Sequence, residues 1–195
     1  AEGIVVRDRE GADLAHARLR IAGPVITADS QEQAVERVNA AADMNVDFIK
    51  IRVDDNLGAT DKMPPDIYQA VIETAHARGL KLTAHLYYLE DAKGLLNAGA
   101  DFIAHSVRDV DVDDELIGLL TENDVCVCPT LMREVSTYVY EERPEWFDDP
   151  FFLKDADPAV LAALEDPERQ EGVQNSRSAQ TYKAQLDTAK RNLKM

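Results

Sequence analysis

The feature that most constrains the fold is a pattern of seven residues that occurs twice, at residues 79–85 and 99–105. In each copy a glycine is followed by a short apolar strand and an Ala-His pair, so His85 and His105 each stand six residues after a glycine. Each glycine ends a helical pattern, as a glycine just past a helix does. The two histidines therefore occupy the same place in successive units, at the C-terminal end of a strand. That edge is where parallel α/β folds build active sites.

The alternation of strand and helix extends over most of the chain. Capping patterns predict one helix from Ser30, where Gln33 completes a capping box, and another from Asp66, which follows two prolines and is expected to be the cap. Further helices are expected over 90–98 and 113–122, and strands over 4–6, 48–53, 80–85, 102–105 and 125–128. Short strands that alternate with helices of about ten to fifteen residues indicate βαβ units and a parallel sheet.

The remainder of the chain has a different pattern. Residues 133–157 are dense in aromatics set among acids and prolines, and we expect a lid-like excursion with at most short helices. Asp157 and Pro158 begin a helix, and helices are expected over 158–195, the last with an apolar stripe of Tyr182, Leu186, Ala189 and Leu193. Since no linker divides the chain, we predict one domain over residues 1–195.

Composition narrows the class of protein. Of 195 residues, 45% are hydrophobic and 30% charged, and the formal net charge is −16. This apolar content excludes a disordered chain. The acidic balance argues against nucleic acid or an anionic membrane as a partner, and no stretch approaches the ~18 apolar residues of a membrane span. The oligomeric state stays open, a homo-oligomer included.

The sequence does not fix the compartment. No signal-peptide pattern is present, so we expect a cytoplasmic protein, or an exported one whose signal peptide was removed. The chain opens without Met on a strand-like run and stops inside a helical pattern at Met195, so we interpret both ends as cuts.

Cys126 and Cys128 stand two apart on one strand face, where they are poorly placed to bridge each other. We expect two buried core thiols rather than a soft-metal site.

His85 and His105 are the strongest candidates for a ligand site. Two imidazoles at matching strand ends would project toward a common centre, as zinc-type first-row metals require. The alternative is that each ring only forms a hydrogen bond at the sheet edge. The residues alone leave these two interpretations open.

Lys50 is out of place in the otherwise apolar strand 48–53. A buried lysine shifts toward the neutral, nucleophilic amine. The alternative, which sequence chemistry alone favours, is that Lys50 reaches solvent or pairs with Asp54 or Asp55. If the two strands share a register, aligning residues 47–49 with residues 101–103 puts Lys50 level with Ala104.

These motifs together resemble the amidohydrolase superfamily. The resemblance rests on Lys50 in Phe-Ile-Lys-Ile, His85 in Leu-Thr-Ala-His, and the run Ala-His-Ser-Val-Arg-Asp at 104–109. The most similar branch is the imidazolonepropionase-like enzymes, which include Xaa-Pro dipeptidases. Residues 112–131, with Pro-Thr-Leu at their end, fit that branch, and segment 3–8 is similar to the family's second strand. The resemblance spans most of residues 1–131 in order.

The resemblance implies a TIM (β/α)₈ barrel of the metal-dependent hydrolase type, with a metal centre at its C-terminal face. Since a complete barrel takes about 250 residues, we expect an incomplete one, from about the second to the seventh strand. The implied cofactor is a divalent metal, zinc by type, as one or two ions. Lys50 would be carboxylated by CO₂ to a bridging carbamate, and His85 and His105 would bind the second metal.

The implied reaction is hydrolysis, in which metal-activated water attacks an amide, lactam or peptide-like C–N bond of a small-molecule or dipeptide-like substrate. The sequence departs from the family in two places. It has no His-x-His pair of the kind that the family carries on its first strand, and the general-base Asp of the last strand is expected beyond Met195. His16 stands alone and His76 lies in the last turn of a helix, so we take neither as a ligand.

Two residues on loops above the metal site are candidates for contacts with substrate. Tyr87 could touch substrate, or it could pack on the barrel rim. Arg108 suits the bidentate recognition of a substrate carboxylate, or it could pair with Asp109 or Asp111.

Two other functions stay open at this point. A truncated or degenerate barrel could act as a non-catalytic binding or structural module, which the missing His-x-His and Asp favour for this chain. A phosphate-binding TIM barrel is disfavoured, because no Gly-rich phosphate loop follows the late strands.

Overall fold

The computed structural model describes residues 2–10, 15 and 17–195. Contacts divide the chain into two compact units. The first unit comprises Ala1–Pro129 together with Met195, and the second comprises Thr130–Lys194.

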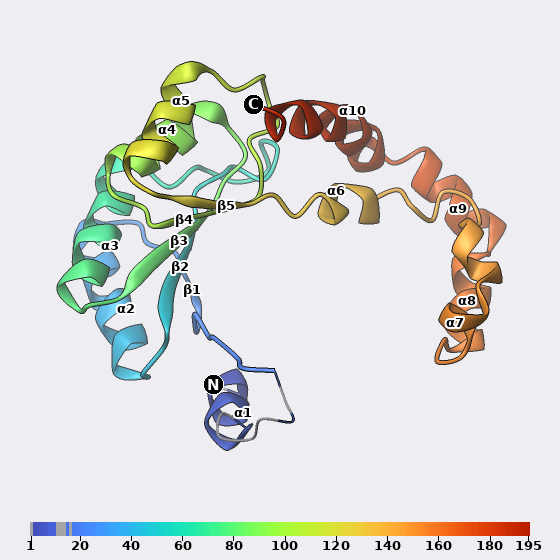
Figure 1. The fold of residues 1–195 in the computed structure, drawn as a ribbon, viewed down its shortest axis with the longest axis horizontal. Coiled ribbons are helices and arrows are strands. Elements are labelled where there is room, and N and C mark those ends of the chain that lie inside the picture. Colours follow the sequence, from blue (N-terminus) through green and yellow to red (C-terminus); the bar gives the residue numbers. More distant parts are fainter. Residues whose placement is uncertain (1, 11–14, 16) are drawn as a thin grey trace. The chain divides into compact units, whose positions relative to one another are not determined.

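The first unit contains a parallel sheet of five strands in the order β1-β2-β3-β4-β5 (Figure 1). The strands are β1 (Val25–Ile26), β2 (Phe48–Arg52), β3 (Lys81–His85), β4 (Phe102–Ala104) and β5 (Cys126–Cys128). The helices are α1 (Glu2–Glu10), α2 (Gln31–Asp43), α3 (Pro65–Ala77), α4 (Leu89–Asn97) and α5 (Asp114–Glu122). The predicted α/β class and parallel sheet are confirmed, whereas closure into a barrel stays a prediction.

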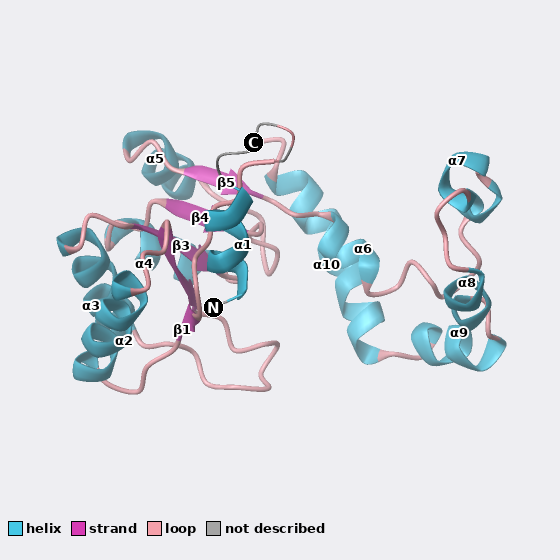
Figure 2. Ribbon diagram, turned by 90° about the horizontal axis from the view of Figure 1, so that it is seen from below, coloured by secondary structure: helices cyan, strands magenta, loops and turns pink. Residues whose placement is uncertain are grey.

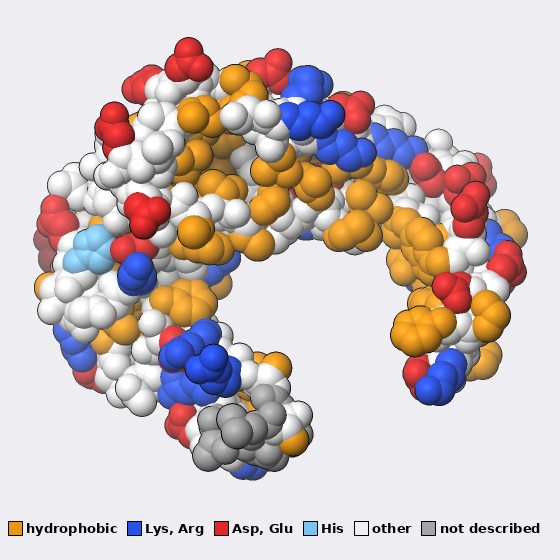
Figure 3. All heavy atoms as spheres, viewed as in Figure 1, with side chains coloured by type: hydrophobic (Ala, Val, Ile, Leu, Met, Phe, Trp, Pro, Cys, Tyr) orange, Lys and Arg blue, Asp and Glu red, His pale blue; other side chains and the backbone are white. Residues whose placement is uncertain are grey.

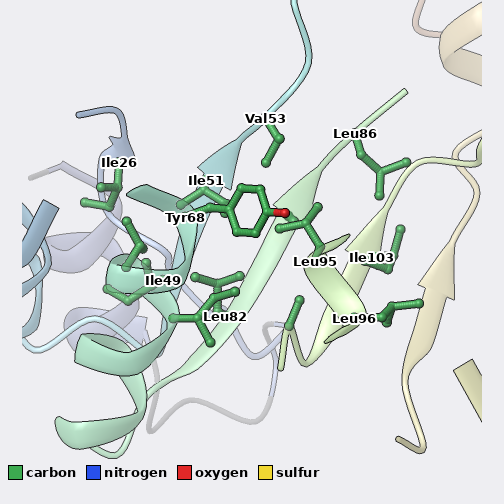
Figure 4. Packing of buried hydrophobic residues seen from close by; sticks show 14 of the residues in the cluster. Ile26, Ile49, Ile51, Val53, Tyr68, Leu82, Leu86, Leu95, Leu96 and Ile103 are labelled. Atoms are coloured by element: carbon green, nitrogen blue, oxygen red, sulfur yellow. The ribbon is translucent and has the colours of Figure 1, made fainter. Parts of the chain in front are cut away.

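Helices α2 to α5 lie on one side of the sheet in both views (Figures 1 and 2). Successive side chains of a strand point to opposite faces, so every second residue of β2, β3 and β4 packs against these helices. Ile49, Ile51 and Leu82 are fully buried in this layer, and Ile103 is nearly so (Figure 4). Burying each such side chain stabilises the fold by about 1.5–3 kcal/mol. The layer therefore holds the C-terminal strand ends in fixed positions.

The opposite face of the sheet carries the candidate site residues in two rows. Arg52, His85, Ala104 and Cys128 are register partners in one row, and Lys50, Thr83, Phe102 and Cys126 form the row before it. Lys50 is thus level with Phe102 rather than Ala104, so the two Asp-Phe-Ile motifs do not share a register, a point that the sequence left open. Local sequence similarity does not set the register, because strand pairing depends on the connecting helices and on which face is buried.

The helix ends follow the sequence signals with one exception. The hydroxyl of Ser30 accepts the N–H of Gln33, as predicted. Gly79 and Gly99 have φ of +71° and +98°, which confirms the predicted left-handed helix ends. In α3 the N-cap is Pro64 and Asp66 lies in the first turn, so the predicted cap was wrong. Pro at the first helical position is already set for a helix and needs no N–H partner, so the helix starts earlier.

The first segment also differs from the prediction. Residues 4–6, expected as a strand, lie in α1, so the segment similar to the family's second strand is helical here. A strand needs a neighbouring strand for its hydrogen bonds, and in the described sheet β1 pairs with β2 alone. A helix satisfies its own backbone. Arg7 fastens α1 by hydrogen bonds to Asp47 and to the carbonyl of Asn45.

Cys126 and Cys128 are exposed free thiols, so their expected burial was wrong. Both lie on the sheet face opposite to α2–α5, where the rows of site residues run. The strand was correctly predicted, but its apolar run does not say which face is covered. The thiol face of β5 is the open one among the described residues.

The second unit is built of helices. They are α6 (Met132–Ser136), the 3₁₀ helix η1 (Glu145–Asp148), α7 (Pro150–Leu153), α8 (Pro158–Leu164), α9 (Pro167–Gln174) and α10 (Arg177–Asn192). Short helices thus occupy segment 133–157, and its action as a lid stays a prediction. Asp157 caps α8, as predicted.

The predicted apolar stripe of α10 is buried at Tyr182, Leu186 and Ala189, whereas Leu193, just past the helix, is exposed. Hydrophobic side chains also gather at the surface around α7 and α8 (Figure 3), where Phe151 is 86% exposed. In the part of the chain that the structure describes, no helix combines the length and the apolar character needed to cross a membrane.

Candidate functional site

The rings of His85 and His105 meet at the C-terminal edge of the sheet. Their centroids lie 4.4 Å apart and their planes cross at 74°. His85 ends β3 beside Ala104, so His105 stands one residue further along than its counterpart. The structure thus brings together the two histidines that the repeated pattern singled out.

A left-handed backbone at His105 makes this meeting possible. Alternation along β4 would turn its side chain to the helix-covered face, since Ala104 before it belongs to the face opposite to α2–α5. The φ of His105 is +79°, which breaks the alternation. The N–H of His105 donates to the carbonyl of Cys128 at 2.8 Å, which ties the turned backbone to the end of β5.

Lys50 lies half-buried on the same sheet face, in the row before His85. Burial lowers the pKa of its amine, and the opposing influence of Cys128 is smaller. The ion pair considered from the sequence does not form, because Asp54 binds Arg52 and His85, while Asp55 accepts the hydroxyl of Tyr88. Burial therefore makes the amine of Lys50 easier to deprotonate than a solvent-exposed lysine.

Asp54 is a site residue that the sequence analysis treated only as a partner for Lys50. Its side chain is 5% exposed, one oxygen lies 2.9 Å from Nε2 of His85, and the other accepts Nε of Arg52 at 2.6 Å. Burial alone would raise the pKa of Asp54, but the hydrogen bonds of His85 and Arg52 outweigh it and hold the pKa well below its usual range. A carboxylate directly after a buried parallel strand was the signal that could have found it.

The loop after β2, which carries Asp54, is tied to the start of α4. The ammonium of Lys62 lies 3.6 Å from the ring centre of Tyr88 and pairs with Asp91. The hydroxyl of Tyr88 donates to Asp55 at 2.8 Å, and burial together with this carboxylate raises the pKa of the phenol. These contacts link two neighbouring loops at the edge where the histidines meet.

Tyr87 and Arg108 are not placed on an open surface. Tyr87 is 7% exposed and stacks on the guanidinium of Arg108, whose carbon lies 4.8 Å from the ring centre. Arg108 is 1% exposed and donates to the carbonyls of Leu86 and Ser106. A substrate would have to open the packing around Arg108 to reach its guanidinium, and the contact of Arg108 with a substrate carboxylate stays a prediction.

His76 does not join the site. Nε2 of His76 lies 2.9 Å from Asp101, which also accepts the N–H of Leu82, so His76 fastens the end of α3 to the start of β3. His16 lies outside the described residues.

The residues fit a metal centre in part. No group of three or more His, Cys, Asp or Glu side chains in the described chain could hold a metal ion. His85 and His105 offer two imidazoles, and a third ligand would have to come from Lys50 in carboxylated form. The hydroxyl of Thr83, the register partner of Lys50, is buried without a hydrogen-bond partner among the described residues. An anionic group on Lys50 would supply the missing acceptor.

A pocket of about 310 Å³ opens at the same edge, between the loops that follow β1 and β2. Its lining includes Thr27, Asp29, Arg52, Lys62, Met63 and Ile67. Because Arg52 binds Asp54, which in turn contacts His85, this pocket adjoins the candidate site. It mixes charged and apolar groups, as small-molecule sites do.

No family model matches the sequence. An uncharacterized protein of Mycobacterium tuberculosis (strain ATCC 25618 / H37Rv) is 32% identical over 131 residues, which cover 64% of this chain and 34% of the relative. An uncharacterized protein of Mycobacterium bovis matches to the same extent. The chain thus spans about a third of the length of the curated relatives that it matches.

Several solved hydrolases share the fold. A Xaa-Pro dipeptidase with bound methionine in the active site has a TM-score of 0.68 at 19% identity, covering 98% of this chain and 49% of that one. Molinate hydrolase has a TM-score of 0.59 at 14% sequence identity, and the match covers 96% of this chain and 60% of molinate hydrolase. An amidohydrolase has a TM-score of 0.51 at 20% sequence identity, and the match covers 80% of this chain and 36% of the amidohydrolase. At these identities the likeness shows the fold, and the structural neighbours are hydrolases.

Proposed function

We propose that the protein is a metal-dependent hydrolase of the amidohydrolase type, or a part of one, that cleaves a C–N bond in an amide, lactam or peptide-like substrate. The observation that carries the proposal is the meeting of His85 and His105 at the C-terminal edge of a parallel sheet, with Lys50 on the same face. The fold shared with a Xaa-Pro dipeptidase and an amidohydrolase supports it.

His85 and His105 would hold a divalent metal, zinc by type, and a carboxylated Lys50 would add an anionic oxygen. Such an ion, when bound, lowers the pKa of water and polarises a substrate carbonyl. Two imidazoles and one carboxylate-like oxygen form a ligand set that zinc accepts.

Lys50 suits carboxylation because burial lowers the pKa of its amine, and only the neutral amine attacks CO₂. The lysine nitrogen forms a bond to the carbon of CO₂, and one C=O pair moves onto oxygen. The proton lost from nitrogen passes to solvent, which leaves a carbamate anion. The buried hydroxyl of Thr83, on the neighbouring strand position, would donate to this anion.

The pocket beside Arg52 suits a small-molecule or dipeptide-like substrate. At about 310 Å³ it lies in the lower range of small-molecule sites. Met63 and Ile67 would contact apolar parts of the substrate, while Arg52 and Lys62 would favour a polar or anionic end.

A non-catalytic binding or structural module is the second candidate. It is favoured by one observation, that the described residues do not bring together three His, Cys, Asp or Glu side chains able to hold a metal. Metal content separates the two candidates.

The test is elemental analysis of protein incubated with Zn²⁺ and bicarbonate and then freed of excess metal. Wild type is expected to retain zinc, His85→Ala to lose it, and His76→Ala to keep it, since His76 pairs with Asp101 instead. With ¹³C-bicarbonate, a carbamate signal is expected that Lys50→Gln abolishes. If wild type retains no divalent metal and none confers activity, the hydrolase proposal fails and the binding module is favoured.

A further inference from the structure

Asp54 is a buried carboxylate to which the proposed reaction gives no role. It follows β2, and its side chain is almost completely withdrawn from solvent. Its two oxygens are used separately, since Oδ1 accepts Nε of Arg52 at 2.6 Å and Oδ2 lies 2.9 Å from Nε2 of His85. With both oxygens engaged, Asp54 is held in one orientation against the histidine ring.

This contact decides which ring nitrogen of His85 carries the hydrogen. An ionised carboxylate only accepts hydrogen bonds, so Nε2 of His85 must donate. In the neutral imidazole the other nitrogen, Nδ1, then keeps its lone pair. The ring of His85 forms no second hydrogen bond within the described chain, so Nδ1 is the atom left to bind a ligand.

We propose that Asp54 is a positioning residue, which holds His85 in the Nε2–H tautomer and so makes Nδ1 the atom that binds the metal. The metal itself rests on the proposed function, but the tautomer does not. Carboxylates commonly hold metal-binding histidines in this way, and their loss typically weakens metal affinity about 10–100-fold. Arg52 completes the arrangement by occupying the oxygen that could otherwise turn to the metal.

The first measurement is the tautomer of His85 in metal-free wild type, by long-range ¹H–¹⁵N correlation at a pH where the ring is neutral. His85→Gln assigns the signals by removing them. The Nε2–H form is expected to dominate. Asp54→Asn retains the shape of the side chain but can both donate and accept, so it is expected to yield a mixture of tautomers.

The matched control is Asp55→Asn, the same change one residue along the chain, in a carboxylate that holds Tyr88 instead of His85. It is expected to leave the His85 tautomer unchanged. The second measurement is Zn²⁺ affinity by competition with a chromophoric chelator. Asp54→Asn is expected to weaken binding about 10-fold or more, and Asp55→Asn about 2-fold or less. Circular dichroism shows whether each variant is folded.

The proposal is overturned if wild-type His85 is the Nδ1–H tautomer, or if a folded Asp54→Asn keeps both the tautomer and the zinc affinity of wild type. If Asp54→Asn does not fold, the tautomer of His85 in wild type alone decides whether the proposal holds. A wild type that binds no metal overturns the proposed function and the ligand role of Nδ1, while the tautomer measurement still decides whether Asp54 positions the ring.

Discussion

The rings of His85 and His105 lie 4.4 Å apart although the two residues are one position out of step in the register of β3 and β4. The mismatch is bridged by the left-handed backbone of His105, with φ +79°. In a residue other than glycine this conformation costs about 1–3 kcal/mol. Its presence where two imidazoles meet indicates that the edge is built to join them at the expense of stability.

This strain can be measured by comparing His105→Gly with His105→Ala. Both remove the ring, but only glycine adopts positive φ without a steric penalty. We expect the glycine variant to have the higher free energy of unfolding in urea, by about 1 kcal/mol. The same pair at His76, in the last turn of α3, should give the opposite sign, since glycine is about 1 kcal/mol worse than alanine in a helix. Equal signs at the two positions would contradict the strain at His105.

The burial of Arg108 predicts a role in stability. Its guanidinium donates to the carbonyls of Leu86 and Ser106 and stacks on Tyr87. A lysine reproduces neither the fork nor the stacking, so Arg108→Lys should lower the free energy of unfolding by about 2–3 kcal/mol. Arg78→Lys, in the surface pair with Asp43, should change it by about 0.5 kcal/mol or less. Wild-type stability in Arg108→Lys, with weakened binding of a carboxylate such as N-acetylglycine, would instead favour the contact first expected for Arg108.

The sequence predicted what depends on local chemistry. The cap at Ser30, the helix-ending glycines, the parallel strands from β2 to β5 and the histidine pair all follow from patterns within a few residues. Register and exposure depend on more distant partners and were missed. The level of Lys50 against β4 and the open face of Cys126 and Cys128 could not be read from short motifs.

The backbone and contacts at the site were the least predictable. The sequence Ala-His-Ser does not predict the positive φ of His105, because only glycine adopts positive φ freely and no glycine stands there. Asp54 forms its hydrogen bond with His85 rather than Lys50 because of the direction in which the side chains point at the strand end. The helix α1 replaced the expected strand because a short apolar run forms a strand only beside a partner.

Asp47 predicts the acid sensitivity of the first unit. Burial raises the pKa of Asp47, but the hydrogen bonds that it accepts lower the pKa by more, to about 2. These bonds come from the side chains of Arg7 and Arg20 and from the backbone N–H of Ile21. Because this pKa lies below the unfolded value of about 3.9, the carboxylate stabilises the fold above about pH 4, and the contribution is lost as the pH falls toward 2. Asp47→Asn should therefore lower the free energy of unfolding by about 1–2 kcal/mol at pH 7. Melting curves from pH 7 to pH 3 should show the two proteins converging, and a constant difference would contradict this role.

At Gly94 we expect a Gly→Ala substitution to destabilise the fold, the reverse of its usual effect inside a helix. Gly→Ala inside a helix normally stabilises by up to about 1 kcal/mol, but a Cβ at Gly94 of α4 would collide with the hydroxyl of Tyr68 from α3. Tyr68 is buried in the core (Figure 4) and has little room to retreat. Gly94→Ala should thus lower the free energy of unfolding by about 1–3 kcal/mol.

Two variants separate this collision from other causes. In Tyr68→Phe the hydroxyl is gone, so adding Gly94→Ala should cost less than it does in wild type. Gly118→Ala in α5, where a Cβ would meet no atom within 4 Å among the described residues, should stabilise instead. Urea denaturation of the four proteins of the Gly94–Tyr68 cycle gives the coupling directly. A coupling near zero would mean that the helices α3 and α4 adjust to the methyl group, and that their close approach does not depend on the missing side chain.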